Sequence, residues 1–253
     1  MEKIEKLKFK KRVLTSTLGL TTLLSLTPIS SEKVSASEFI NYDINYNYDV
    51  LSDINHYCAV YNLKPELVVD IIKNRTYDFG DVAWGQYNMI GYKIYDNKKL
   101  ALLEVIKDIH DNPKSYGYTK EEIKSNYIYE STNTPEMMVE EYASIYDIPS
   151  EIALAIMYSE CGREMNSHNY LVNNNPAGIG PHMHFENKEV GIIYFIDMLK
   201  TKYGCNNEST NEFFDLVAKK YCNENKEHWV SMTNSFYNDI KDEKVLVKEK
   251  TSK

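Results

Sequence analysis

The sequence predicts an all-α fold, and three observations lead to this prediction. Between Pro149 and Gly162 there is no glycine or proline, and apolar residues recur at helical spacing. A second amphipathic helix is expected from about Lys188 to Lys202. The third observation is that the first half of the chain carries a similar pattern, which indicates a repeated helix–loop–helix unit.

The first 36 residues have the features of a secretory signal peptide. Basic residues crowd the segment from Glu2 to Arg12, an apolar segment runs from Val13 to Leu26, and Val34-Ser35-Ala36 forms a small-residue cleavage site. We therefore expect cleavage after Ala36, a secreted or cell-wall-associated protein, and no stable membrane insertion of the mature chain. Residues 37–49 are polar and rich in Tyr and Asn, which predicts a linker.

Residues 50–130 are predicted to be a degenerate copy of the unit in residues 131–242. The segment that starts at Tyr57 aligns with the segment that starts at Tyr142 at an offset of 85, and the later helices align at an offset of 90. The alternative is that two amphipathic helical patterns agree by chance. The first unit is expected either to pack against the second or to hold more of a glycan strand.

Turn and capping signals separate the remaining elements. A turn is expected from Asn112 to Tyr118, and Thr119 and Thr134 are predicted N-caps of the helices that follow them. Residues 211–240 are expected to form two short helices. The charged tail, residues 243–253, is expected to be disordered.

Glu160 is the candidate catalytic residue. Ala153, Ile156 and Met157 lie seven, four and three residues before it, so the four side chains share a helical face that is expected to be buried. Burial disfavours a carboxylate and raises its pKa, and the negative end of the helix dipole before the expected cap Gly162 acts in the same direction. A carboxyl that keeps its proton near neutral pH can serve as a general acid. The alternative is an ordinary solvated glutamate at a helix end.

In the first unit, Arg75 takes the position of Glu160 at the offset of 85. Arginine cannot give up its proton near neutral pH, so the first unit is expected to be catalytically silent.

The segment from Asn173 to Gly180 is rich in asparagine and glycine. Its glycines allow the backbone to approach a ligand, and its amides can bond sugar hydroxyl and acetamido groups. The alternative is an ordinary surface turn.

In this order, the motifs resemble the glucosaminidase family of peptidoglycan hydrolases, close to glycoside hydrolase family 73. The resemblance covers roughly Asn133 to Ile240. The matching positions are Glu160, Cys161, Gly162, Asn174 to Ile179, Phe185, Gly191, Ile192, Leu199, Lys200 and Tyr203, with Tyr221 and Trp229-Val230 similar to the closing helices.

The resemblance implies a lysozyme-like helical domain that cleaves a β-1,4 bond of the cell-wall glycan, with Glu160 as the catalytic acid. The predicted partners are therefore peptidoglycan glycan strands. The residues expected to bind the substrate are Asn174, Asn175, Gly178, Phe185 and Tyr221.

One departure from the family concerns the second acidic group. Many members carry a β-hairpin lobe with an acidic residue before the aromatic position, but only five residues separate Ile179 from Phe185. Glu164, Glu186 and Glu189 are near in sequence and lie in no recognisable motif. We therefore expect one protein acid, with an acetamido or hydroxyl group of the substrate completing the reaction.

Charge argues against a nucleic-acid partner. The chain has a net charge of −8, and residues 1–36 hold seven positive and three negative groups, so the mature protein carries about −12. No metal or other cofactor is expected.

The chain has four cysteines, and in an exported protein this even number predicts disulfides, with Cys205 and Cys222 placed to close a loop. Alternatives to a glucosaminidase remain at this stage: a lytic transglycosylase or muramidase, a wall-binding or conjugation scaffold, and an amidase or peptidase. The last would use Cys161 as nucleophile with a histidine partner. The candidate partners are His168, His182 and His184.

Overall fold

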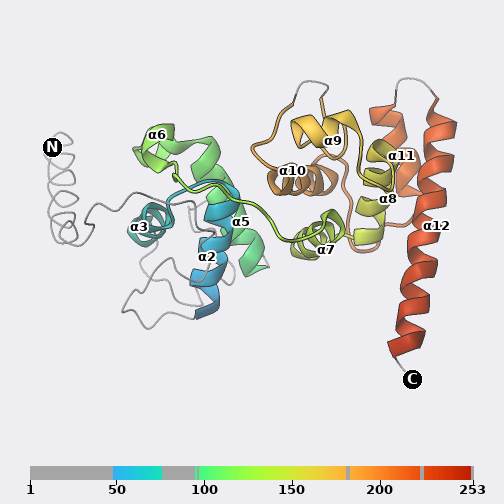
Figure 1. Cartoon of the computed structure of the whole chain (residues 1–253), viewed down its shortest axis with the longest axis horizontal. Coiled ribbons are helices and arrows are strands. Elements are labelled where there is room, and N and C mark those ends of the chain that lie inside the picture. Colours follow the sequence, from blue (N-terminus) through green and yellow to red (C-terminus); the bar gives the residue numbers. More distant parts are fainter. Residues whose placement is uncertain (1–47, 76–94, 96, 181–182, 223–224, 252–253) are drawn as a thin grey trace, which may run out of the picture. The chain divides into compact units, whose positions relative to one another are not determined.

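The computed structural model describes residues 48–75, 95, 97–180, 183–222 and 225–251 (Figure 1). The predicted signal peptide and the linker as far as residue 47 lie outside these ranges. Within them the chain is helical and forms no strand, and a lone bridge joins Leu63 to Lys124. The all-α prediction is therefore confirmed. None of the described helices has the length and apolar character needed to cross a bilayer.

The described residues of the first unit form three helices followed by two short ones. Helix α2 packs against both α3 and α5, and the 3-10 helix η3 and helix α6 follow. Their bounds are α2 Tyr48–Val60, α3 Pro65–Arg75, α5 Lys98–Asp111, η3 Pro113–Tyr116 and α6 Lys120–Ile123. Thr119 caps α6 as predicted, because its hydroxyl accepts from the Glu122 N–H while the Glu122 carboxylate accepts from the Thr119 N–H.

The second unit has a similar beginning and then adds two helices. Helix α7 packs against α8 and α10, whereas α12 packs against both α8 and α11 (Figure 1). The bounds are α7 Pro135–Ile145, α8 Ser150–Cys161, α9 His168–Asn173, α10 Lys188–Thr201, α11 Phe213–Tyr221 and α12 Lys226–Thr251. Thr134 caps α7, as predicted, by accepting from the Met137 N–H at 3.3 Å.

The helices of the two units correspond as the sequence alignment predicts. At an offset of 85, the last residue of α2 matches the last residue of α7 and the first residue of α3 matches that of α8. At an offset of 90, both ends of α5 match both ends of α10. The turns agree as well, since Asn62 and Asp147 each adopt a left-handed conformation with φ of 53°.

Reciprocal contacts join the two units. The side chain of Asn97, which caps α5, donates to the Ile145 carbonyl at the end of α7, at 3.2 Å. The equivalent Asn187, which caps α10, donates to the Val60 carbonyl at the end of α2, at 2.8 Å. Buried side chains of both units belong to one hydrophobic core. Each unit therefore completes the helix cap and the core of the other.

The charged end of the chain differs from its prediction. Helix α12 continues to Thr251, so residues 243–251 are helical rather than disordered, and the second of the two expected helices is long. This end has no glycine or proline, and Lys244 anchors it to α8 by donating to Ser150 and Glu151 at 2.9 and 3.1 Å.

The disulfide prediction is also wrong, because all four cysteines are free thiols. Cys205 and Cys222 have different neighbours: Ser209 hydrogen-bonds the Cys205 thiol, whereas Cys222 lies within the electrostatic influence of Glu160.

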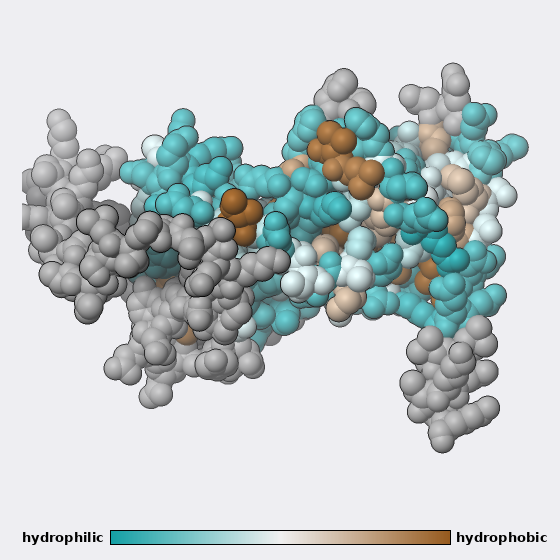
Figure 2. Space-filling model, viewed as in Figure 1, coloured by the Kyte–Doolittle hydropathy of each residue, from teal (hydrophilic) through white to brown (hydrophobic). Residues whose placement is uncertain are grey.

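The face of the molecule seen in Figure 2 is largely hydrophilic. Apolar colour gathers over α9, where Leu171 and Val172 are 55% and 59% exposed. Both belong to the helix that leads into the asparagine-rich loop.

Candidate active site

Glu160 lies in the last turn of α8, a helix that is buried along most of its length. Ala153, Ile156 and Met157 are buried as predicted, and Glu160 itself is half-buried. Gly162 ends the helix with φ of 72°, a conformation that favours glycine. Pro149 lies immediately before the first helical residue, where its missing N–H removes nothing from the helix.

Trp229 of α12 holds one oxygen of the Glu160 carboxyl. The indole Nε1–H donates to Glu160 Oε1 at 2.7 Å, and the Trp229 side chain is only 8% exposed. The sequence did not predict this role, because Trp229 was identified only as part of a helix similar to the closing helices of the family. The contact depends on the packing of α12 against α8, and no local pattern around Trp229 predicts it.

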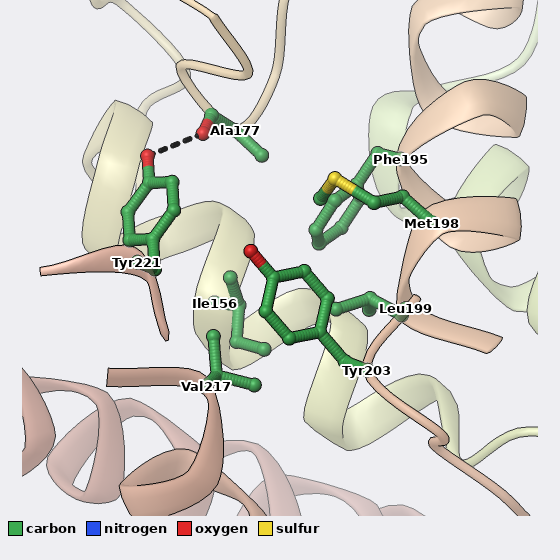
Figure 3. Close-up of a pocket in the computed structure, with 8 residues that line it drawn as sticks. All are labelled: Ile156, Ala177, Phe195, Met198, Leu199, Tyr203, Val217 and Tyr221. Carbon is green, nitrogen blue, oxygen red and sulfur yellow. Dashed lines mark hydrogen bonds between the residues drawn. The ribbon is translucent and has the colours of Figure 1, made fainter. Parts of the chain in front are cut away.

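The glycine-containing loop approaches the other oxygen. Gly178 has φ of 57°, and a Cβ atom added there would lie 3.4 Å from Glu160 Oε2 and 3.1 Å from the Tyr221 hydroxyl oxygen. The Tyr221 hydroxyl donates to the Ala177 carbonyl at 2.7 Å (Figure 3). Three of the residues expected in the site, Glu160, Gly178 and Tyr221, therefore meet at one point.

Burial dominates the electrostatics of Glu160. It raises the pKa of the carboxyl, and the hydrogen bonds of Trp229 and Tyr221 act in the opposite direction without cancelling the effect of burial. Both opposing groups are uncharged. The arrangement therefore keeps the acid protonated to a higher pH than a solvated glutamate, which is the property that a general acid requires.

The side chains of the two asparagines expected to bind a sugar form hydrogen bonds with backbone groups of their own loop. Asn175 is 1% exposed, and its side-chain amide accepts from the Ile179 N–H and donates to the Ile179 carbonyl at 3.0 and 2.8 Å. Asn174 has φ of 53°, and its side chain donates to the Phe185 carbonyl at 2.9 Å. These contacts give both residues the task of shaping the loop that carries Gly178.

Phe185 packs away from the carboxyl. Its ring lies 5.1 Å from the ring of Tyr194 on α10, measured between centroids, and its N–H donates to the Asn173 carbonyl at 3.0 Å. The structure places it as a closing residue of the loop, and the contacts that it makes do not include Glu160.

The three glutamates that lie near Glu160 in sequence, and could have supplied a second acid, have other neighbours. Glu186 pairs with His110 at 3.4 Å, and Glu164 is exposed near Asn166. Glu189 is 1% exposed and accepts hydrogen bonds from the hydroxyls of Tyr129 and Tyr142. None of the three is joined to Glu160.

Cys161 has the environment of a packed thiol. It donates to the Pro176 carbonyl at 2.8 Å, and burial raises its pKa to about 11, so it carries little thiolate near neutral pH. The described hydrogen bonds join it to Ser167 and to no histidine. His168 and His184 are exposed, and His182 is outside the described residues. Within the described ranges no three potential metal ligands gather.

A small apolar cavity lies behind the loop. Its volume is about 10 Å³, roughly the space that one water molecule needs. Figure 3 shows the Tyr203 hydroxyl directed toward the middle of the lining side chains. The lining consists of Ile156, Ala177, Phe195, Met198, Leu199, Tyr203, Val217 and Tyr221. A sugar ring does not fit in this space.

We compared the chain with protein-family models, with curated proteins and with solved structures, and none of the three comparisons gave a match. The function is therefore argued from the geometry of the site.

Proposed function

We propose that this protein is a secreted peptidoglycan hydrolase that cleaves a β-1,4 glycosidic bond of the cell-wall glycan, of the N-acetylglucosaminidase type. One observation carries the proposal. The half-buried Glu160 carboxyl, whose pKa burial raises, borders a glycine at which an added Cβ would lie 3.4 Å from the acid and only 3.1 Å from the Tyr221 hydroxyl oxygen. A leaving-group oxygen has to come this close to a general acid.

The proposed reaction begins with proton transfer from Glu160 to the oxygen that links two sugars. The bond between that oxygen and the anomeric carbon then breaks with its electron pair going to the oxygen, while Glu160 becomes a carboxylate. An acetamido or hydroxyl group of the substrate is assigned the attack on the anomeric carbon. Water then opens the product of an acetamido attack, which gives overall hydrolysis.

Attack on the anomeric carbon by the exocyclic hydroxyl of the same sugar, with no later water step, would make the protein a lytic transglycosylase on the same glycan. Cleavage of the other amino-sugar linkage would make it a muramidase. These two outcomes share the Glu160 chemistry and differ in their products.

Product analysis tests the proposal. The purified mature protein is incubated with peptidoglycan, and the products are identified by mass spectrometry. Hydrolysis gives new reducing ends, and transglycosylation gives anhydro ends. New free amines would indicate a cysteine amidase or peptidase, and binding without products would indicate a scaffold. Either of the last two results would contradict the proposal.

A further inference from the structure

The two oxygens of the Glu160 carboxyl have different environments. Oε1 accepts from the Trp229 indole at 2.7 Å. Oε2 faces the backbone at Gly178, where a Cβ atom would lie 3.4 Å away. An indole nitrogen can only donate, and the carbonyl oxygen of a neutral carboxyl accepts better than its hydroxyl oxygen, so the bond through Oε1 favours the proton on Oε2.

Trp229 is held in place by polar contacts between the helices. The Thr233 hydroxyl, one turn further along α12, donates to the Trp229 carbonyl at 2.8 Å and lies 2.8 Å from the Ser159 hydroxyl. Ser159 precedes Glu160 on α8 and donates to the Ala155 carbonyl at 2.8 Å. Thr233 is fully buried, so these contacts fix the position of the indole relative to the end of α8.

The Tyr221 hydroxyl has one proton to donate and two possible acceptors, the Ala177 carbonyl and the Glu160 carboxyl. It donates to the Ala177 carbonyl at 2.7 Å, and it is also a hydrogen-bond neighbour of Glu160. While Glu160 is protonated, the tyrosine proton can stay on Ala177. When Glu160 becomes a carboxylate, rotation of the same hydroxyl brings that proton to the carboxylate without transferring it.

We propose that Trp229 is a positioning residue that fixes the Glu160 carboxyl with its transferable proton on Oε2, beside Gly178, and that Tyr221 redirects its hydroxyl to Oε2 as that proton leaves. This inference rests on the proposed function. It explains why the loop has no side chain at position 178, since the leaving-group oxygen has to approach Oε2. It also assigns stabilisation of the charge that develops in the transition state to two uncharged donors.

The test compares W229F and Y221F with Y158F as the matched control. The Tyr158 hydroxyl donates to Glu136 at 3.1 Å, so Y158F also removes an aromatic donor from a glutamate, but at another point of α8. We expect W229F and Y221F each to lower kcat by about 10- to 100-fold with little change in KM. Each should also move the alkaline limb of the pH–rate profile to higher pH, because removal of a donor disfavours the carboxylate. Y158F should leave kcat and the limb as in the parent.

A carbon-13 NMR titration of the Glu160 carboxyl, assigned with E160Q, gives a second readout that does not need turnover. A higher Glu160 pKa in both W229F and Y221F supports the inference. An unchanged pKa in either variant, or a lower kcat with an unmoved alkaline limb, overturns it. If W229F does not fold, Y221F decides alone, since it keeps the aromatic ring.

A parent protein that releases no glycan product contradicts the proposed function itself. The titration does not need turnover, so it still tests the hydrogen-bond assignment in that case.

Discussion

Lys107 and Asp197 occupy equivalent positions in the two repeats, 90 residues apart, and form an ion pair with each other. This ion pair joins α5 to α10. Both side chains are largely buried, at 17% and 16% exposure. If the two units are copies as the sequence predicts, these equivalent positions hold opposite charges where identical charges would repel.

A double-mutant cycle measures this contact. We expect K107A and D197A each to lower the free energy of unfolding by about 1 to 3 kcal/mol, since each leaves a largely buried charge without its partner. The double variant should lose less than the sum, with a coupling of about 1 to 2 kcal/mol, measured by urea denaturation. Strictly additive losses would show that the pair contributes nothing to the joining of the units.

The reciprocal caps give a prediction with a built-in control. N97A and N187A remove both a helix cap and a bond to the other unit, whereas T134A removes a cap alone. A cap is worth about 1 kcal/mol, and a second hydrogen bond adds about as much, so N97A and N187A should each cost about 2 kcal/mol against about 1 for T134A. Thermal melts of the three variants check the order. Equal losses would contradict the assigned role of the asparagines in the unit contact.

His56 and Glu189 make the stability of the unit contact depend on pH. Burial lowers the pKa of His56, but its hydrogen bond to Glu189 and the nearby negative charges together outweigh this and leave the pKa raised above 6.5. Burial raises the pKa of Glu189, but the bonds from His56, Tyr142 and Tyr129 leave it below 4.5. Glu141 and Asp53 also face His56 and favour its charged form.

The contribution of His56 is therefore complete below pH 6.5 and is lost as pH rises through the raised pKa. That of Glu189 is present above pH 4.5 and is lost as pH falls through the lowered pKa. We expect the parent to lose its advantage in urea midpoint over H56Q between pH 6 and pH 9. If the difference between parent and H56Q stayed constant across this range, His56 would have no titrating role in stability.

Gly178 and Gly204 form a matched pair. Both have positive φ, 57° and 80°, but an added Cβ at Gly178 would lie 3.1 Å from the Tyr221 hydroxyl oxygen and 3.4 Å from Glu160 Oε2, whereas at Gly204 it would meet nothing within 4 Å. G178A and G204A should each lose about 1 to 2 kcal/mol of stability from backbone strain. Only G178A should also lose about 100-fold in glycan cleavage, because it displaces the acid and occupies the approach to Oε2. Equal activity of the two variants would mean that the space over Gly178 is not used by substrate.

Local patterns in the sequence predict the helices well and the site in part. Cap residues such as Thr119 and Thr134, and the absence of glycine and proline in α8, are local signals, and they predict the helices correctly. Glu160 and Gly178 lie in two motifs that follow one another closely in the sequence, and the order of these motifs predicts that they face each other.

What the sequence does not reveal depends on packing between distant segments. Trp229 is 69 residues from Glu160, and its contact exists because α12 packs on α8. The loop asparagines illustrate the opposite case: the amide chemistry that suits a sugar also suits the nearby backbone, and in the structure Asn174 and Asn175 donate to backbone carbonyls. The charged end of α12 was predicted to be disordered because its contacts are distant in sequence: Lys244 donates to residues at the start of α8.

The most direct test of the central claim is the release of reducing or anhydro ends from peptidoglycan by E160Q, with E164Q as the control. Glu164 is an exposed glutamate four residues away, so E164Q makes the same chemical change outside the site. We predict that E160Q releases these ends at least about 100-fold more slowly than the parent, because an amide cannot supply the proton, while E164Q keeps the parental rate. Digestion of peptidoglycan by E160Q at the parental rate would contradict the assignment of Glu160 as the catalytic acid.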